Sequence, residues 1–562
     1  MNIPRPEYPR PQFKRENWTN LNGTWQFDFD FGVTGRERKL HEAASLSKEI
    51  TVPFCPESDL SGIGYKDFIP ACWYKKSIDI DLKENTRYIL HFGACDYLTE
   101  VWVNGESVGK HRGGYISFSF DVTSKLKNGE NVITVCAEDN LRTHNQPSGK
   151  QSDTFNSYGC FYTRTTGIWQ TVWMEEVPVS YVKRIKTTPE VDKKLLRIEA
   201  ECNFANGMEI KAEAFFENTS VGVAAATVYG RTAIIELPLT ELHLWEIENP
   251  VLYGLVLTMG DDKVESYFGM RSVYAIDGKL FINGKGIYQR LILDQGFYPD
   301  GIYTAPSDAE LIGDIKRSME LGFNGARLHE KIFEERFLYH CDRLGYIVWG
   351  EHANWGLDIG KPEAWKNFIP EWTEEMQRDY NHPALIGWCP LNETEPNQDP
   401  EFVRYLVTVT KAFDPYRPVI DCSGWYHVDD ISDFWCMHDY DQNPETFKAH
   451  YAPLEKGEKV ECRVKHKWGF TTFMSEYGGI QWAKDSTGWG YGNAPKTEEE
   501  LLDRLEGLTN VLLENSAFTG FCYTQLTDVE QEQNGLYTYD RVLKFPKDRL
   551  YKIFSKKAVW EE

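Results

Sequence analysis

The second part of the chain alternates short apolar segments with longer segments of helical periodicity. From about residue 277, apolar runs recur between stretches such as Ala309 to Leu321, which carries apolar residues at helical spacing. This alternation predicts parallel strands joined by helices. The strand candidates are Ile287–Leu293, Phe323–Leu328, Tyr346–Gly350, Ala384–Cys389, Pro418–Asp421, Phe434–Met437, Thr472–Met474 and Gly520–Tyr523. Eight such units in roughly 290 residues predict a closed (β/α)₈ TIM barrel.

The residues before the predicted barrel have the pattern of β-sandwiches. Leu98 to Val103 alternates and is followed by Asn104-Gly105, the strongest short-range signal of a hairpin. Further short strands are expected at Tyr88–Phe92, Tyr115–Val122, Val132–Ala137 and Ile168–Met174. These predict a sandwich or jelly roll over residues 1–180, and a second run of strands predicts an immunoglobulin-like sandwich over 181–276. The barrel is then expected over 277–562.

Charge and composition exclude two classes of partner. The net charge of −24, from 61 basic and 85 acidic side chains, would repel a nucleic acid, whose binding depends on Lys and Arg. No run of about 18 apolar residues predicts a membrane span, and the start MNIPRPEYPRPQF does not resemble a signal peptide. The twelve cysteines form no CxxC pair, which favours reduced thiols and a cytoplasmic location.

Polar side chains stand where the predicted barrel strands end, which is where barrels of this kind carry their chemistry. Charged groups at this density are costly to bury unless they are paired or used. Because each sugar hydroxyl both donates and accepts hydrogen bonds, a ring of such polar side chains suits a polyhydroxylated substrate. The candidates are Asp294, Arg327, His329, Glu351, Asn354, Trp355, Asn392, Glu393, His438, Asp439, Tyr440, Glu476, Tyr523 and Gln525.

Two of these carboxylates, Glu393 and Glu476, have the pattern needed to hydrolyse a glycoside. One carboxyl group must protonate the leaving oxygen and the other must attack the anomeric carbon, and a separation of roughly 5 Å gives a retaining reaction. Either Glu alone could instead be a salt-bridge partner at a strand end. A metal site at Glu351, His329 and Asp294 is the other alternative, but the sequence lacks HxH or HExxH spacing. We expect no metal and no cofactor.

The whole chain resembles glycoside hydrolase family 2, which contains β-galactosidases, β-glucuronidases and β-mannosidases. The resemblance covers nearly all 562 residues, and the motifs are specific in combination. They are VWVNG within Tyr97–Gly105, GGY at Gly113–Tyr115, RTTGIWQTVW at Arg164–Trp173, FINGK at Phe281–Lys285, GFNGARLHE at Gly322–Glu330, NET at Asn392–Thr394 and SEYGG at Ser475–Gly479.

The resemblance implies a jelly-roll sugar-binding domain, an immunoglobulin-like domain and a catalytic barrel, with a role for several residues. Glu393 is expected to be the acid/base and Glu476 the nucleophile, oriented by Arg327 with Tyr440 beside it. Asn392 is expected to bind the sugar 2-hydroxyl. Asp294 is expected to bind distal hydroxyls, and Tyr523 stands where many members have a Trp under the sugar ring. The remaining residues expected to bind substrate are His329, Asn354, Trp355, His438 and Gln525.

The sequence gives less about which sugar is bound. β-Glucuronidases of the family carry Asn-x-Lys before a Gly near the last strand, whereas this chain reads Glu532-Gln533-Asn534-Gly535, and a Glu would repel a uronate. We therefore expect a retaining, exo-acting β-glycosidase, first of all a β-galactosidase. A β-L-arabinosidase, a β-mannosidase and a uronidase are the alternatives, and a catalytically inactive carbohydrate-binding protein is the rival of another class. Homo-oligomers are expected, because members of the family often form them.

Overall fold

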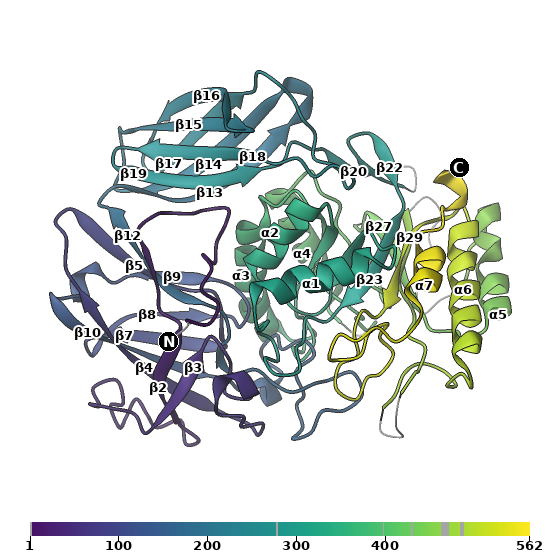
Figure 1. Ribbon diagram of the computed structural model, residues 1–562, viewed down its shortest axis with the longest axis horizontal. Helices are drawn as coiled ribbons and strands as arrows, with labels where there is room; N and C mark the ends of the chain where they lie inside the picture. The colour runs from purple at the N-terminus through teal and green to yellow at the C-terminus, as the bar shows by residue number, and fades with distance from the viewer. Residues whose placement is uncertain are drawn as a thin grey trace.

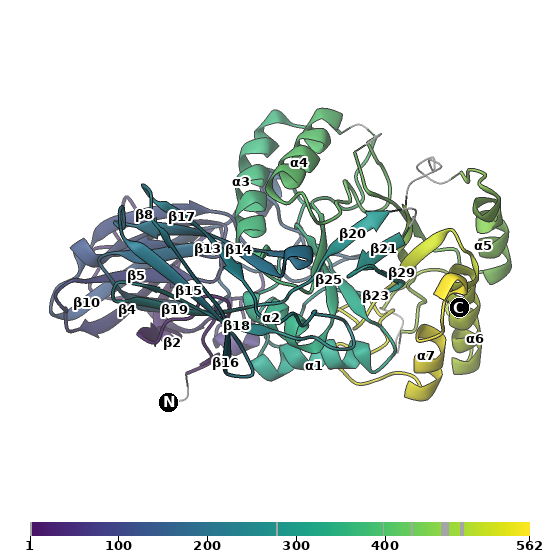
Figure 2. The ribbon, with the colours of Figure 1, turned by 90° about the horizontal axis from the view of Figure 1, so that it is seen from above.

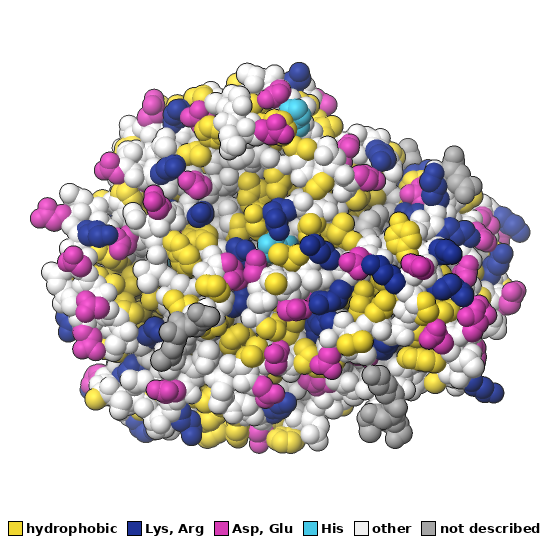
Figure 3. Space-filling view, viewed as in Figure 1, with side chains coloured by type: hydrophobic (Ala, Val, Ile, Leu, Met, Phe, Trp, Pro, Cys, Tyr) yellow, Lys and Arg dark blue, Asp and Glu magenta, His cyan; other side chains and the backbone are white. Residues whose placement is uncertain are grey.

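A computed structural model describes residues 3–276, 279–396, 398–428, 431–461, 471–483 and 488–561. The chain folds as a jelly-roll sandwich, an immunoglobulin-like sandwich and a TIM barrel. In Figure 1 the jelly roll lies at the lower left, the second sandwich above it and the barrel to the right. The turned view in Figure 2 shows that both sandwiches lie on the same side of the barrel. On the face shown in Figure 3, basic and acidic side chains are interspersed over all three parts.

The jelly roll packs a six-stranded sheet against a four-stranded one. Apolar residues of both sheets, among them Trp25, Leu90 and Val135, share one buried core. The predicted hairpin turn is confirmed, with Asn104 and Gly105 both at positive φ between β7 and β8. The strands are β1 Trp18–Asn20, β2 Gly23–Phe29, β3 Lys48–Val52, β4 Ala71–Ile80, β5 Thr86–Phe92, β6 Cys95–Asp96, β7 Leu98–Val103, β8 Glu106–Arg112, β9 Phe118–Asp121, β10 Gly129–Glu138, β11 Gly167–Ile168 and β12 Val172–Pro178.

Two predicted jelly-roll strands are shorter than the sequence pattern indicated. The run Tyr115–Val122 is a strand only over β9, and Ile168–Met174 is broken between β11 and β12. In both places the missing residues, Tyr115 and Trp169 among them, are buried in a separate apolar cluster shared with the barrel. Contact between domains therefore replaces strand pairing at these positions.

The second sandwich contains a three-stranded and a four-stranded antiparallel sheet. Its strands alternate buried and exposed residues, and the inward faces form one core that includes Ile198, Ala212 and Leu257. A small three-stranded sheet then leads into the barrel. The strands are β13 Tyr181–Glu190, β14 Leu195–Asn203, β15 Glu209–Phe216, β16 Thr219–Thr227, β17 Thr232–Pro238, β18 Tyr253–Met259, β19 Asp262–Phe268, β20 Val273–Ile276, β21 Lys279–Ile282 and β22 Lys285–Ile287.

The barrel is a curled parallel sheet of seven described strands in the order β26-β25-β24-β23-β29-β28-β27. Most residues of these strands are buried beneath the surrounding helices, as both faces of a parallel barrel require, and only the end of β27 at His438 and Asp439 is partly exposed among the described strand residues. The strands are β23 Gln289–Asp294, β24 Gly325–Leu328, β25 Ile347–Glu351, β26 Leu385–Cys389, β27 Phe434–Asp439, β28 Thr471–Gly478 and β29 Phe518–Thr524. The helices are α1 Asp308–Met319, α2 Glu335–Leu344, α3 Pro362–Asp379, α4 Pro400–Phe413, α5 Pro444–Tyr451, α6 Glu498–Glu514 and α7 Lys547–Phe554. No helix of the described residues is long and apolar enough to cross a bilayer.

The predicted fifth barrel strand, Pro418–Asp421, is not a regular strand. Between β26 and β27 the chain makes two isolated parallel bridges, Trp388 with Val419 and Asn392 with Ser423. Pro418 has no N–H to donate, and the N–H of Val419 binds the side chain of Asp433 instead of a strand. The segment still lies beside β26, because the two bridges join it to Trp388 of β26 and to Asn392, three residues after that strand.

A long segment of the jelly roll, residues 144–163, lies on the barrel; we name it the docking loop. The N–H groups of Ser148 and Gly149 donate to the carbonyl oxygen of Trp355 at 2.9 and 3.0 Å. Gly149 has a φ of 54°, and a Cβ there would lie 2.2 Å from the carbonyl oxygen of Glu330. Only glycine permits so close an approach between the two domains.

Another contact between the jelly roll and the barrel buries carboxyl groups of α3. The Glu371 carboxylate accepts the N–H of Tyr115 at 2.8 Å, and its other oxygen has no hydrogen-bond partner among the described residues but lies 3.9 Å from His352 Nε2. Burial raises the pKa of Glu371 to about 7, with His352 opposing the shift and Glu375 adding to it. A carboxyl group whose pKa is raised by folding stabilises the protein at low pH, and this contribution is lost as the pH rises through the folded pKa.

Glu371→Gln is therefore expected to become more stabilising, relative to the unchanged protein, as the pH rises from 5 to 8. We expect the difference in melting temperature to grow by roughly 2–5 °C across this range, because the amide cannot ionise. Thermal unfolding at both pH values checks this. Glu363→Gln, on the exposed side of the same helix, serves as the control and should show no such trend. A pH-independent effect of Glu371→Gln would contradict the assignment.

Candidate active site

Glu393 and Glu476 face each other at the carboxyl ends of the barrel strands. Glu393 follows β26, Glu476 lies near the end of β28, and His438 lies between them on β27. The His438 Nδ1 atom lies 2.7 Å from Glu393 Oε1 and 3.3 Å from Glu476 Oε2. One carboxylate oxygen of Glu393 lies within 4.8 Å of one of Glu476. This separation is near that of retaining glycosidases and leaves no room for a water between the two groups and a sugar carbon.

Glu476 is held as an anion. Its Oε1 accepts from Arg327 Nη1 at 3.0 Å, and its Oε2 accepts from the Tyr440 hydroxyl at 2.6 Å. Burial alone would raise the pKa of Glu476, but His438, His329, Arg327 and the Tyr440 hydrogen bond together lower it to about 2. The carboxylate is therefore ready to act as a nucleophile near neutral pH.

Arg327, on β24, is the residue that joins the site together. All five of its N–H groups are used: two go to Glu351, two to the carboxylate of Glu476 and the carbonyl of Ser475, and one to the side chain of Asn392. The side chain is 1% exposed. A guanidinium is planar and offers its donors in a fixed arrangement, so it fixes the relative positions of its partners as well as their charge.

Asn392 offers a free donor to a ligand. Its Oδ1 accepts from Arg327 at 3.0 Å, whereas its buried Nδ2 has no partner among the described residues. The Asn354 side chain accepts from the Asn392 N–H and donates to the Asn392 carbonyl, and Trp355 Nε1 donates to the same carbonyl at 3.2 Å. An unpartnered buried amide is costly, so this donor indicates a ligand acceptor at that point.

Glu393 occupies an unusual backbone position. Its φ is 49°, and its N–H donates to the carbonyl of Ser423 at 2.8 Å. The Ser423 hydroxyl lies 3.0 Å from His438 Nε2, so the irregular fifth segment supports both residues. A left-handed conformation in a non-glycine residue costs energy and is concentrated at functional sites.

The trio of Glu393, His438 and Glu476 has the spacing of a metal site. Arg327 and Tyr440 already bind both oxygens of Glu476, however, and a cation there would meet the Arg327 charge. The arrangement therefore suits a pair of carboxyl groups acting on a sugar better than a metal centre.

Of four further predicted residues, Asp294 and Tyr523 do not contact the carboxyl pair within the described part of the chain. His329 Nδ1 binds Glu351 at 2.7 Å, and Gln525 Nε2 donates to Asn534 at 2.8 Å. Asp294 ends β23 and accepts the N–H of Gly296, and no contact with the carboxyl pair connects it to the centre within the described part of the chain. Tyr523 is corrected: its ring packs against Phe554 of α7 and Tyr477.

Tyr523 therefore lies between β29 and its helices, away from the sugar. Successive side chains of a strand point to opposite faces, and it is the next residue, Thr524, that lies inside, 3.1 Å from the Tyr440 hydroxyl. The resemblance indicated the correct strand, but the residue of β29 that faces Tyr440 is Thr524 and not Tyr523.

The site also contains residues that sequence reasoning did not choose. Glu351 was named as a strand-end candidate and in the metal alternative but not among the residues expected to bind substrate, although it accepts from Arg327 and His329. Lys150 and Tyr162 come from the docking loop, and Tyr162 donates to the buried carboxylate of Glu532. No periodicity or motif marks the docking loop, because its position is set by contact with the barrel.

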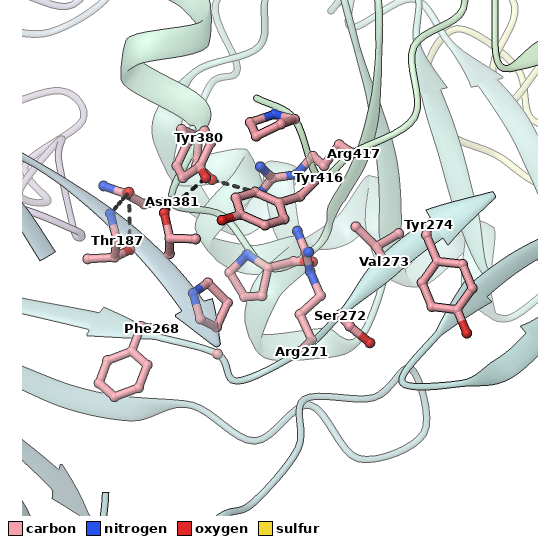
Figure 4. Close-up of a pocket in the computed structure, with 15 residues that line it drawn as sticks. Thr187, Phe268, Arg271, Ser272, Val273, Tyr274, Tyr380, Asn381, Tyr416 and Arg417 are labelled. Carbon is pink, nitrogen blue, oxygen red and sulfur yellow. Dashed lines mark hydrogen bonds between the residues drawn. The ribbon is translucent and has the colours of Figure 1, made fainter. Parts of the chain in front are cut away.

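A cavity of about 340 Å³ lies elsewhere, between the immunoglobulin-like domain and the barrel (Figure 4). Thr187 of β13 and Tyr380, at the end of α3, line it, and Arg271 and Arg417 bind the carbonyl of Leu385 at the start of β26. The amino ends of barrel strands lie at the face opposite the active site, so this cavity is separate from the carboxyl pair.

Family comparisons agree with this geometry. Models described as the sugar binding domain of glycosyl hydrolases family 2, as glycosyl hydrolases family 2, and as the family's TIM barrel domain match residues 18–178, 180–271 and 277–480. The chain belongs to glycoside hydrolase family 2. This confirms the family and the three-part fold that the sequence motifs indicated.

Relatives within family 2 carry two different names. A putative beta-glucuronidase of Formosa agariphila is 28% identical over 69% of this chain, and the match spans 47% of that protein's length. The beta-glucuronidase of Felis catus is 25% identical, over 77% of this chain and 73% of its own. A beta-galactosidase of Thermoanaerobacter pseudethanolicus is 24% identical, over 84% and 64%. The crystal structure of Ruminococcus gnavus beta-glucuronidase has the same fold, with a TM-score of 0.82 at 18% identity over 99% of each chain.

Arg327→Met is expected to destabilise the protein by about 3–5 kcal/mol, because it leaves Glu351 and Glu476 buried without their cation. Adding Glu351→Gln should restore part of this loss, since one uncompensated charge is then removed. Unfolding in urea of the single and double variants measures both effects. Arg343→Met, at an exposed position of α2, is the control. If Arg327→Met were as stable as the unchanged protein, the buried carboxylates of Glu351 and Glu476 would not depend on Arg327 for their stability.

Proposed function

We propose that this protein is a retaining, exo-acting β-glycosidase that removes a terminal β-D-galactosyl residue from a small oligosaccharide or glycoside. The observation that carries the proposal is the carboxyl pair, with one oxygen of Glu393 within 4.8 Å of one of Glu476. The two groups differ in environment: Arg327 and Tyr440 bind Glu476, whereas the Glu393 side chain is 11% exposed and, among the described residues, its hydrogen-bond partner is the imidazole of His438.

In the first step, Glu393 gives its proton to the glycosidic oxygen as the bond to the anomeric carbon breaks. Glu476 attacks the same carbon from the opposite face and forms a covalent glycosyl-enzyme. In the second step, Glu393 takes a proton from water, and the resulting hydroxide displaces Glu476. Two inversions give a product with the original β configuration.

The surrounding residues support the developing charges. The free Nδ2 of Asn392 is placed to bind the sugar 2-hydroxyl, a contact that strengthens in the transition state. Arg327 keeps Glu476 ionised and in position before the attack and stabilises the carboxylate when it leaves. Asp294, His329, Asn354, Trp355, His438, Tyr440 and Gln525 complete the proposed substrate and supporting residues.

The identity of the sugar is the finer part of the proposal. Glu532 stands where family β-glucuronidases have an Asn, and a buried carboxylate there favours a neutral galactoside. A terminal uronide is the second candidate, because Lys150 places a buried cation in the site and several relatives are named as glucuronidases. The proposal also includes a cytoplasmic location and assembly as a homo-oligomer. The described cysteines are all free, which supports a reducing compartment.

Glu476→Gln is expected to lower kcat by about 10³–10⁵ on p-nitrophenyl β-galactoside, as loss of a covalent nucleophile does. Release of p-nitrophenol from a panel of β-galactoside, β-glucoside, β-mannoside, β-glucuronide, β-galacturonide and L-arabinosides measures this and identifies the sugar. Glu395→Gln, an exposed carboxylate two residues from Glu393, is the matched control and should keep full activity.

Glu393→Ala gives a second, independent signature. Azide should restore its turnover and yield a β-glycosyl azide, because the anion attacks the glycosyl-enzyme without needing a general base. An α-glycosyl azide from this variant would reverse the two roles. Full activity of Glu476→Gln would rule out the double displacement, and silence of the unchanged protein on every glycoside would favour a binding protein.

A further inference from the structure

Lys150 is a buried cation without a protein acceptor. Its residue is 5% exposed, and within the described part of the chain its ammonium makes no hydrogen bond and no ion pair. The nitrogen lies 3.6 Å from the ring centroid of Trp355. A lysine offers three donors and no acceptor, so a buried lysine with none of its donors used leaves room for oxygens from a ligand.

The backbone fixes this ammonium relative to the catalytic residues. The carbonyl of Lys150 accepts from the N–H of Tyr162 at 2.7 Å, and the preceding Gly149 donates to the Trp355 carbonyl at 3.0 Å. Trp355 in turn donates from Nε1 to the carbonyl of Asn392. The docking loop, Trp355 and the residue before Glu393 therefore form one connected unit, and the position of Lys150 follows from it.

Glu532 is the acidic counterpart on the barrel side. Its residue is 2% exposed, and its two oxygens accept from the Tyr162 hydroxyl and from Asn534 Nδ2, the latter at 3.0 Å. Each carboxylate oxygen can accept a second hydrogen bond. Tyr162 thus contacts the main chain of Lys150 with its N–H and the side chain of Glu532 with its hydroxyl.

The two charges act on each other and on the catalytic pair. Burial lowers the pKa of Lys150, but Cys160 and the carboxylates of Glu532, Glu393 and Glu476 raise it by more. Burial raises the pKa of Glu532, and Lys150 opposes that shift. Carboxyl groups therefore surround the Lys150 ammonium, and a uronate would add one more anion to them.

We propose that Lys150 and Glu532 bind the hydroxyl groups of a neutral terminal sugar from opposite domains, and that the Glu532 carboxylate excludes uronides. The proposal rests on the glycosidase function stated above and names the residues that choose its substrate. Lys150 donates to hydroxyl oxygens and Glu532 accepts from hydroxyl hydrogens. Without the negative charge of Glu532, a uronate carboxylate would no longer be repelled and could bind the Lys150 ammonium.

The test compares kcat/KM for p-nitrophenyl β-galactoside with kcat/KM for the matching β-galacturonide. Glu532→Gln should raise the uronide-to-neutral ratio at least tenfold, because the repelling charge is gone and Lys150 remains. The double variant Lys150→Met with Glu532→Gln should lose that gain. Glu530→Gln removes an equal charge two residues away, where the side chain binds the N–H of Thr163, and should leave the ratio unchanged.

Lys150→Met alone provides a measurement that does not depend on the folding of the Glu532 variants. It should lower kcat/KM on the neutral substrate at least tenfold without lowering the melting temperature by more than a few degrees. Unchanged kcat/KM in this variant overturns the proposal, as does a ratio in Glu532→Gln equal to that in Glu530→Gln.

The outcome also separates this proposal from the proposed function. An unchanged protein that cleaves the uronide in preference, and loses that activity in Lys150→Met, keeps the glycosidase function and overturns the exclusion by Glu532. An unchanged protein that cleaves no glycoside overturns both. The proposal is supported if the unchanged protein prefers the neutral glycoside, Glu532→Gln raises the uronide-to-neutral ratio at least tenfold, and the double variant loses that gain.

Discussion

The buried guanidinium of Arg327 is the interaction on which the rest of the site depends. Among the described residues, it alone contacts the carboxylates of Glu476 and Glu351 and the amide of Asn392 together. Burying four carbonyl or carboxylate acceptors costs desolvation free energy. The delocalised cation of Arg327 offsets this cost because it donates hydrogen bonds to all four in a fixed geometry. The same cation helps to keep Glu476 ionised, so the stability of the network and the charge state of this carboxylate share one cause.

Much of the site follows from the sequence because barrel topology is so restrictive. Once short parallel strands are recognised, their carboxyl ends must meet, and that alone brings Glu393, Glu476, Arg327, Asn392 and Tyr440 together. The main-chain roles of Asn354 and Trp355 are finer details, but the residues themselves were within the predicted set. Local pattern and family motifs agree at these positions, which is why they were predictable.

The failures have physical causes of their own. Tyr523 was misplaced because a strand presents alternate residues to its two faces, and the sequence of a fully buried strand does not show which face is which. Pro418–Asp421 has the apolar character of a strand, but a proline and side-chain hydrogen bonds prevent regular pairing. Lys150 was missed because its place depends on packing between domains more than 200 residues apart in the chain, which no local pattern records.

The close approach at Gly149 makes the barrel an incomplete receptor when considered alone. The carboxyl pair belongs to the barrel, whereas Lys150 and Tyr162 beside it are supplied by the jelly roll. Insertions or replacements in the docking loop can therefore change which substrates are accepted while the bond-breaking residues stay as they are. The docking loop and the carboxyl pair thus lie in separate segments of the chain, and their sequences can vary independently.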